Sequence, residues 1–227
     1  MILLWVMLKI KISIFNCFKI LKKDLGVLYA KKEIQNQINK LDKNKIHILY
    51  FSYYLNLHNI WHSPLMLTTK LLNFFTGKKS IDHVNHVCRF IFDDENNNWI
   101  AKVFEATMDR GMEQNDLFDK LKTFQGICYI ETLDKNVDKA KAKKFEMDYT
   151  GVPYSKELAA LAGIDLGVLD KKIKLKTNGG FCSWLEALFL IDQGIDLSKI
   201  QKGNPLEITP ADLFLADLGE KEILFKS

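Results

Sequence analysis

The chain of 227 residues is long enough to bury a hydrophobic core without help from disulfides or metal ions. Hydrophobic residues make up 48% and charged residues 26% of the chain, which is ordinary for a globular protein and excludes global disorder. The 32 basic and 28 acidic side chains leave a net charge of +4, a dispersed surplus that does not indicate a nucleic-acid partner.

The first eight residues, MILLWVML, are apolar but too few to cross a bilayer as a helix. Lys9 and Lys11 interrupt the apolar run and follow it, whereas the positive charges of a secretory signal precede it. Three interpretations stay open. The segment is a buried element of the fold, or residues 1–23 anchor the chain at a membrane surface, or translation starts at Met7.

Residues 17–45 are predicted to form a polar helix, because isoleucines and a leucine recur in it at helical spacing. We therefore expect an apolar and helical extension over residues 1–45, followed by one domain over residues 46–227. A cytoplasmic or virion-associated location is favoured, with a peripheral membrane location as the alternative.

The cysteines are far apart in the sequence and form neither a CxxC pair nor a Cys/His cluster at zinc spacing. They are Cys17, Cys88, Cys128 and Cys182. A chain of this length does not need disulfides, so we expect free thiols, no metal site and no cofactor.

Four strands and three helices are predicted from β-branched and aromatic runs, helical spacing and turn residues. The strands are residues 45–51, 85–92, 99–106 and 125–132, and the helices are residues 65–75, 134–149 and 181–190. A further helix is expected to start at Thr209-Pro210, with proline in its first turn.

The second and third strands are predicted to form a hairpin around an Asp/Asn-rich turn. If the hairpin is symmetric, Phe92 lies opposite Trp99, Cys88 opposite Val103, and His86 opposite Glu105. Directly opposed side chains have Cβ atoms about 5 Å apart, so the register makes a histidine and a carboxylate neighbours. A slip of one residue would place them on opposite faces.

Cys182 follows Gly179-Gly180 and lies in the first turn of a predicted helix. Free N–H groups and the positive end of the helix dipole favour a thiolate there, and the same N–H groups can stabilise an oxyanion. The alternative interpretation is a small, buried core residue.

His86 is the candidate general base, and Glu105 would orient its imidazole and stabilise the imidazolium. The alternatives are a strand histidine with an ordinary hydrogen bond and an exposed carboxylate. His83 is the second choice of base, because a continuous strand turns it to the other face. Cys88 and Cys128 lie within strands, with no helix terminus nearby, and are interpreted as core residues.

The order of His, Glu and a helix-starting Cys resembles the circularly permuted NlpC-type papain-like cysteine peptidase superfamily, especially its YiiX/YebB-like branch. The resemblance covers roughly residues 46–218. Its motifs are Asn85-His86-Val87, Val103-Phe104-Glu105-Ala106, Gly151-Val152-Pro153-Tyr154, Phe181-Cys182-Ser183 and Thr209-Pro210-Ala211-Asp212-Leu213.

This resemblance implies an α+β papain-like fold, with an antiparallel sheet packed on a late helix that carries the nucleophile. By the family pattern Cys182 is the nucleophile, His86 the base and Glu105 its orienting partner. Tyr154 and Ser183 are assigned to substrate binding or oxyanion support.

Three functions remain open at this point. The first is a thiol hydrolase that acts through an acyl-enzyme, with amide bonds of cell-wall peptides as the substrate implied by the resemblance. The second is a lipid-directed acyltransferase or phospholipase with an acyl-lipid substrate, held at a membrane through residues 1–23. The third is a non-catalytic structural or binding protein of a virion or envelope assembly.

Overall fold

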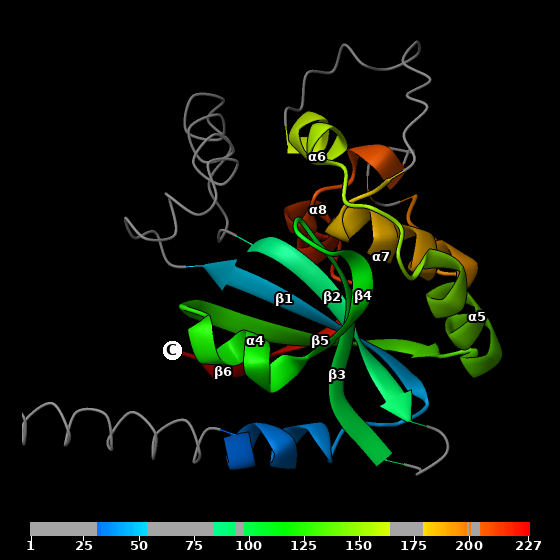
Figure 1. Cartoon of the computed structure of the whole chain (residues 1–227). Helices are drawn as coiled ribbons and strands as arrows, with labels where there is room; N and C mark the ends of the chain where they lie inside the picture. The colour runs from blue at the N-terminus through cyan, green and yellow to red at the C-terminus, as the bar shows by residue number, and fades with distance from the viewer. Residues whose placement is uncertain (1–30, 54–83, 94–97, 164–178, 199, 201–204) are drawn as a thin grey trace, which may run out of the picture. The chain divides into compact units, whose positions relative to one another are not determined.

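The computed structural model describes residues 31–53, 84–93, 98–163, 179–198, 200 and 205–227 (Figure 1). The chain divides into two units, residues 1–41 and residues 42–227. In the first unit, residues 31–38 are helical.

The helix predicted for residues 17–45 ends earlier than expected, at residue 38, because a turn follows it. The carboxylate of Asp42 accepts a hydrogen bond from the backbone N–H of Asn44 at 3.0 Å, and the Asp42 carbonyl accepts one from Lys45 N–H at 3.0 Å. An aspartate that bonds the backbone two residues on favours a turn over a helix.

The second unit is an α+β domain built on a six-stranded sheet, in which each neighbouring pair of strands is antiparallel. The order across the sheet is β4-β3-β2-β1-β5-β6. The strands are β1 (Lys45–Tyr53), β2 (Val84–Asp93), β3 (Asn98–Thr107), β4 (Gly111–Asp116), β5 (Gly126–Asn136) and β6 (Gly219–Lys226).

The helices of this domain are short. They are α4 (Leu117–Thr123), α5 (Lys139–Tyr149), α6 (Lys156–Gly163), α7 (Cys182–Asp192) and α8 (Pro210–Leu215), with a 3-10 turn, η1 (Pro205–Glu207), before α8. Within the described ranges, no helix has the length and apolar character needed to cross a membrane.

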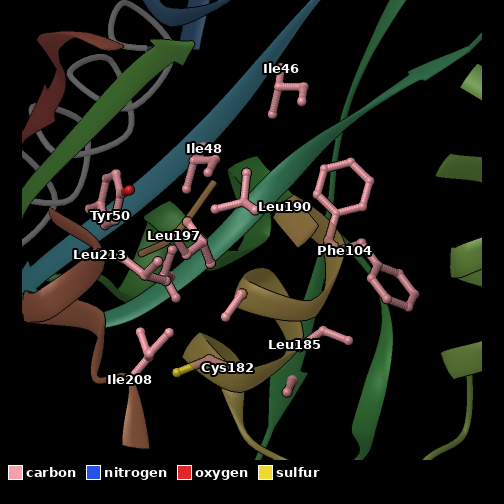
Figure 2. Packing of buried hydrophobic residues seen from close by; sticks show 14 of the residues in the cluster. Ile46, Ile48, Tyr50, Phe104, Cys182, Leu185, Leu190, Leu197, Ile208 and Leu213 are labelled. Carbon is pink, nitrogen blue, oxygen red and sulfur yellow. The ribbon is translucent and has the colours of Figure 1, made fainter. Parts of the chain in front are cut away.

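The main core lies between α7 and one face of the sheet (Figure 2). Side chains two residues apart on a strand share a face, and Ile46, Ile48 and Tyr50 of β1 all belong to this core. From α7 come Leu185 and Leu190, both fully buried. The helix is therefore held against the sheet by a row of aliphatic and aromatic contacts.

The predicted strands are confirmed, and each is one to four residues longer at one or both ends. Helix α7 is also confirmed, and α8 begins as expected, with Thr209 as its N-cap and a reciprocal bond from Asp212. Strands β4 and β6 and helices α4 and α6 were not predicted. The predicted helix at residues 65–75 lies outside the described residues.

The helix predicted to start at residue 134 starts at Lys139 instead. Strand β5 continues as far as Asn136, where it still pairs with Lys45 of β1. Asp138 then caps the helix by accepting a hydrogen bond from Lys141 N–H at 3.1 Å.

The hairpin register is correct next to the turn and wrong farther along. Phe92 pairs with Trp99 as predicted, but Phe90 pairs with Val103 and Arg89 with Phe104. Three residues of β3 span the interval that one residue spans on β2, so the register shifts by two. A shift of two preserves the side-chain faces, so His86 and Glu105 still share a face although they are not direct partners.

We predict that Leu185→Ala lowers the free energy of unfolding by about 3 kcal/mol, because a fully buried leucine leaves a cavity between α7 and the sheet. Denaturant unfolding followed by circular dichroism measures this loss. Ile191→Ala on the same helix is the matched control, since Ile191 is 47% exposed and should cost much less. Equal losses in the two variants would contradict the packing described here.

Candidate active site

Two glycines, Gly179 and Gly180, precede α7 where the backbone packs closely against neighbouring residues. A Cβ atom on Gly180 would lie 2.0 Å from a ring carbon of Trp184, and one on Gly179 would lie 2.6 Å from the carbonyl oxygen of Pro153. Neither position accommodates a side chain. The close approach fixes where the first turn of α7 begins, and hence where Cys182 lies.

The same approach pairs the backbone of Tyr154 with the residues just before α7. Tyr154 forms a parallel bridge with Gly180, supported by a 2.7 Å hydrogen bond from Ser155 N–H to the Gly180 carbonyl. Burial, together with the charge of Cys182, raises the pKa of the Tyr154 hydroxyl above its ordinary value. The hydroxyl therefore stays protonated at neutral pH and is able to donate a hydrogen bond beside Cys182.

Strands β2 and β3 stop pairing just where the site begins. Their paired register ends at Arg89 and Phe104, and β2 continues for several residues toward its N-terminal end. There the backbone N–H of Val87 donates a hydrogen bond to the sulfur of Cys182. The sulfur thus accepts a backbone hydrogen bond from the part of β2 that β3 no longer pairs with.

His86 lies on the face of the sheet opposite the one on which α7 packs. Its ring centroid lies 5.8 Å from that of Phe51, and Phe51 alternates on β1 with Tyr50, which faces α7. The imidazole nevertheless hydrogen-bonds the Cys182 side chain. This contact lies beyond Arg89–Phe104, the last paired residues of β2 and β3 on this side.

The two nitrogens of His86 have different partners. Nε2 lies 2.5 Å from Oε2 of Glu105, so the imidazole N–H donates to the carboxylate there. The ring also hydrogen-bonds the Cys182 side chain, and because Nε2 is taken by the carboxylate we infer that this contact is made by Nδ1. The ring therefore connects the carboxylate on β3 to the sulfur on α7.

Glu105 is held by two further side chains that the sequence analysis missed. Lys120 of α4 forms an ion pair with Oε2, the same oxygen that His86 uses, and Nδ2 of Asn115 on β4 donates to Oε1 at 3.0 Å. The available signal was Asp116, which caps α4 by accepting hydrogen bonds from two backbone N–H groups, with Leu117 and Leu121 one turn apart.

The charges in the site favour a thiolate beside an imidazolium. Burial alone would raise the pKa of the Cys182 thiol, but the hydrogen bond and charge of His86, with the N–H groups of Val87 and Ser183, bring this pKa below its ordinary value. Burial and Lys120 lower the pKa of His86, but Glu105 and Cys182 outweigh them and raise it overall.

Glu105 remains ionised despite being only 2% exposed. Burial raises the pKa of a carboxyl group, but the charges and hydrogen bonds of His86 and Lys120 hold the pKa of Glu105 well below its usual range. An ionised Glu105 is what keeps the imidazole of His86 protonated.

Cys182 is 5% exposed, and its surroundings are not purely apolar. The imidazole of His86 and two backbone N–H groups bond the sulfur, while the remaining contacts come from the core around α7. The hydroxyl of Ser183 donates to the Ile208 carbonyl at 2.7 Å, so this side chain fixes α7 to the segment before α8, and only its N–H points to the sulfur.

Of the other cysteines, Cys88 lies close to His86 and Glu105 but within the buried part of β2, and Cys128 lies in β5. Cys88 and Cys128 are fully buried, as expected for core residues, and burial raises the pKa of each thiol. Cys17 and the rival base His83 lie outside the described residues. The structure therefore brings together His86, Glu105 and Cys182, whose chemical roles stay predictions.

Among the described residues, His86, Cys88 and Glu105 have ligand atoms within 4.8 Å of one another. Oε2 of Glu105 already bonds both His86 and Lys120. The ammonium group of Lys120 already pairs with Glu105 and would repel a cation. These residues fit a hydrogen-bonded charge network better than a metal site.

A second buried carboxyl group lies one turn after Cys182. Glu186 is fully buried, and neither of its oxygens has a hydrogen-bond partner among the described residues. Burial raises the pKa of Glu186 to about 7, although the nearby charge of Arg89 opposes this. Arg89 also pairs with Glu146 at 3.5 Å, and its guanidinium carbon lies 3.8 Å from the ring centroid of Phe189.

Comparisons with protein-family models, with curated proteins and with solved structures found no match. The chemistry of the site therefore follows from the contacts of its own residues.

We predict that iodoacetamide alkylates Cys182 roughly ten times faster than Cys88 or Cys128 in the folded protein at neutral pH, because its lower pKa populates the thiolate. Peptide mass spectrometry after timed quenching measures the three rates. His86→Ala should slow the alkylation of Cys182 and Cys128→Ser should not. A rate at Cys182 that is independent of His86 would contradict the geometry described above.

The raised pKa of Glu186 predicts that the free energy of unfolding depends on pH. Because its pKa is higher in the folded state than in the unfolded state, folding takes up a proton between about pH 4.5 and 7, and its contribution to stability is lost as the pH rises through that interval. As the pH rises across this interval, the free energy of unfolding of Glu186→Gln should increase relative to that of the wild type by on the order of 3 kcal/mol. Urea unfolding at several pH values tests this, with exposed Glu222→Gln as the control. A constant difference would contradict it.

Proposed function

We propose that the protein is a thiol hydrolase that cleaves an amide bond through an acyl-enzyme on Cys182. The observation that carries this proposal is the position of the His86 ring, which bonds Glu105 through Nε2 and also hydrogen-bonds the Cys182 side chain. A nucleophile, a base within hydrogen-bonding reach and a group that orients the base are the requirements for this chemistry.

In the acylation step the thiolate of Cys182 attacks the carbonyl carbon, and the carbonyl electron pair moves to oxygen. When the tetrahedral intermediate collapses, the C–N bond breaks and His86 donates its proton to the leaving amine. The products of this step are a thioester on Cys182, a free amine and a neutral imidazole. Glu105 keeps the ring in place and stabilises the imidazolium before the transfer.

In the deacylation step the neutral imidazole of His86 removes a proton from water, and the resulting hydroxide attacks the thioester carbonyl. The C–S bond breaks, the carboxylic acid leaves, and the sulfur and imidazole return to the ion pair. The same nitrogen thus serves first as the acid and then as the base.

We assign oxyanion support to the Tyr154 hydroxyl. A tyrosine hydroxyl is protonated at neutral pH, and burial together with the charge of Cys182 raises its pKa further. A donor that is already in place where negative charge develops stabilises the transition state without reorganisation. The hydroxyl of Ser183 is bonded to Ile208, so any part that Ser183 has in oxyanion support comes from its backbone.

We further propose that the α+β domain is a circularly permuted papain-like fold. The support is the order of the parts: the base on β2 and the carboxylate on β3 precede the nucleophile, which begins a helix late in the chain. That helix packs on the antiparallel sheet through its apolar side chains. A peptide amide, as in cell-wall peptides, is the substrate class that this scaffold favours. The segment invoked for membrane attachment, residues 1–23, lies outside the described residues.

We predict that Cys182→Ala and His86→Ala each reduce hydrolysis by a factor of at least about 1,000, because each removes a group that forms or breaks bonds. The substrates are a panel of cell-wall stem peptides and p-nitrophenyl acetate, and mass spectrometry of the quenched ester reaction should show an acetyl group on Cys182. Cys128→Ser is the matched control. Full turnover by a folded Cys182→Ala protein would overturn the proposal.

The pH dependence of turnover should be bell-shaped. Activity should rise with pH through the lowered pKa of Cys182, as the thiolate forms, and fall through the raised pKa of His86, as the imidazolium is lost. A steady-state pH series of kcat/KM measures both limbs. A profile that rises only in the ordinary thiol range, near pH 8.5, would contradict an ion pair.

A further inference from the structure

Lys120 is the one lysine of α4 that the structure places in the site. Its side chain is 17% exposed and forms an ion pair with Oε2 of Glu105. Its ammonium group also lies 4.9 Å from the ring centroid of Phe51, over the same ring that contacts His86. By contrast, Lys122 is 59% exposed and pairs with Asp119 of its own helix.

Lys120 and His86 bond the same oxygen of Glu105, and this sharing has an electrostatic consequence. The carboxylate raises the pKa of the imidazole, whereas the positive charge of Lys120 lowers it. The titratable groups that interact with Lys120 are Glu105 of β3, His86 and Cys88 of β2, Tyr53 of β1 and Cys128 of β5, and of these Glu105 is the carboxylate.

We propose that Lys120 is a positioning residue of the site, which aligns Glu105 for His86 and sets the pH range in which Cys182 is reactive. This proposal rests on the proposed function, since it concerns the ion pair on which that function depends. Glu105, which orients His86, is thus itself held in place by Lys120 of α4, on the face of the sheet opposite α7.

The charge of Lys120 affects both ends of the pH range in the same direction. A nearby positive charge favours whichever form of the site carries more negative charge, so it lowers both the pH at which the thiolate forms and the pH at which the imidazolium is lost. If that charge is removed, both limbs should move to higher pH by about one unit, and near the acid limb the thiolate population should fall about tenfold.

The alternative is that Lys120 only stabilises the fold by neutralising a buried carboxylate. Loss of such a partner would lower the free energy of unfolding and the amount of folded protein. It would reduce the rate by the same factor at every pH, without moving either limb. The position of the limbs therefore separates the two roles.

The test measures the rate of iodoacetamide alkylation of Cys182 as a function of pH, by peptide mass spectrometry, in the full-length wild type and in three variants. We expect Lys120→Met to move the first rise of this profile upward by about one pH unit. Lys120→Arg keeps the charge and should restore the wild-type position, and Lys122→Met should leave it unchanged. If Lys120→Met does not fold, Lys120→Gln and the salt dependence of the wild-type limb provide the same comparison.

The outcomes separate this inference from the proposed function. A wild-type profile with one rise in the ordinary thiol range would contradict the ion pair and the proposed function with it. If the wild-type rate first rises at a pH below the ordinary thiol range, and Lys120→Met does not move this rise, then only the role of Lys120 is overturned. An upward shift that Lys120→Arg reverses would support the proposal, whereas a uniform loss at every pH would assign Lys120 to stability only.

Discussion

An ionised carboxylate that is almost fully buried costs several kcal/mol unless its neighbours compensate for the lost water. Glu105 is such a group, and the surrounding structure supplies that compensation. Its three partners, His86, Lys120 and Asn115, come from β2, α4 and β4. A carboxylate fixed from three elements gives the imidazole one orientation, and the imidazole in turn determines the ionisation of the sulfur.

In this arrangement the base and the nucleophile come from opposite faces of the sheet. The base lies on the face with Phe51 and Lys120, while the nucleophile arrives on α7, which packs against the opposite face. A continuously paired sheet would keep the two apart. The pairing of β2 with β3 ends at Arg89, and the sulfur of Cys182 bonds the N–H of Val87 and the ring of His86 beyond that end.

The sequence was sufficient for the parts of the site that depend on alternation and on turn residues. His86 and Glu105 were predicted to share a face, and this survived an error in the register because the error was an even number of residues. Lys120 and Asn115 were missed because α4 is short and its cap gives a weak signal. The end of the β2–β3 pairing at Arg89 was also missed, because the predicted hairpin was taken as symmetric along its whole length.

The order of the elements along the chain also implies an order of assembly. His86, Glu105, Asn115 and Lys120 belong to neighbouring elements that are synthesised well before α7. These four residues are therefore able to form their contacts before α7 is present. The pKa of the Cys182 thiol falls only when α7 packs against the strands. Any loosening of α7 returns Cys182 to an ordinary thiol while the sheet is still intact, so the protein should lose its reactivity before it loses its shape.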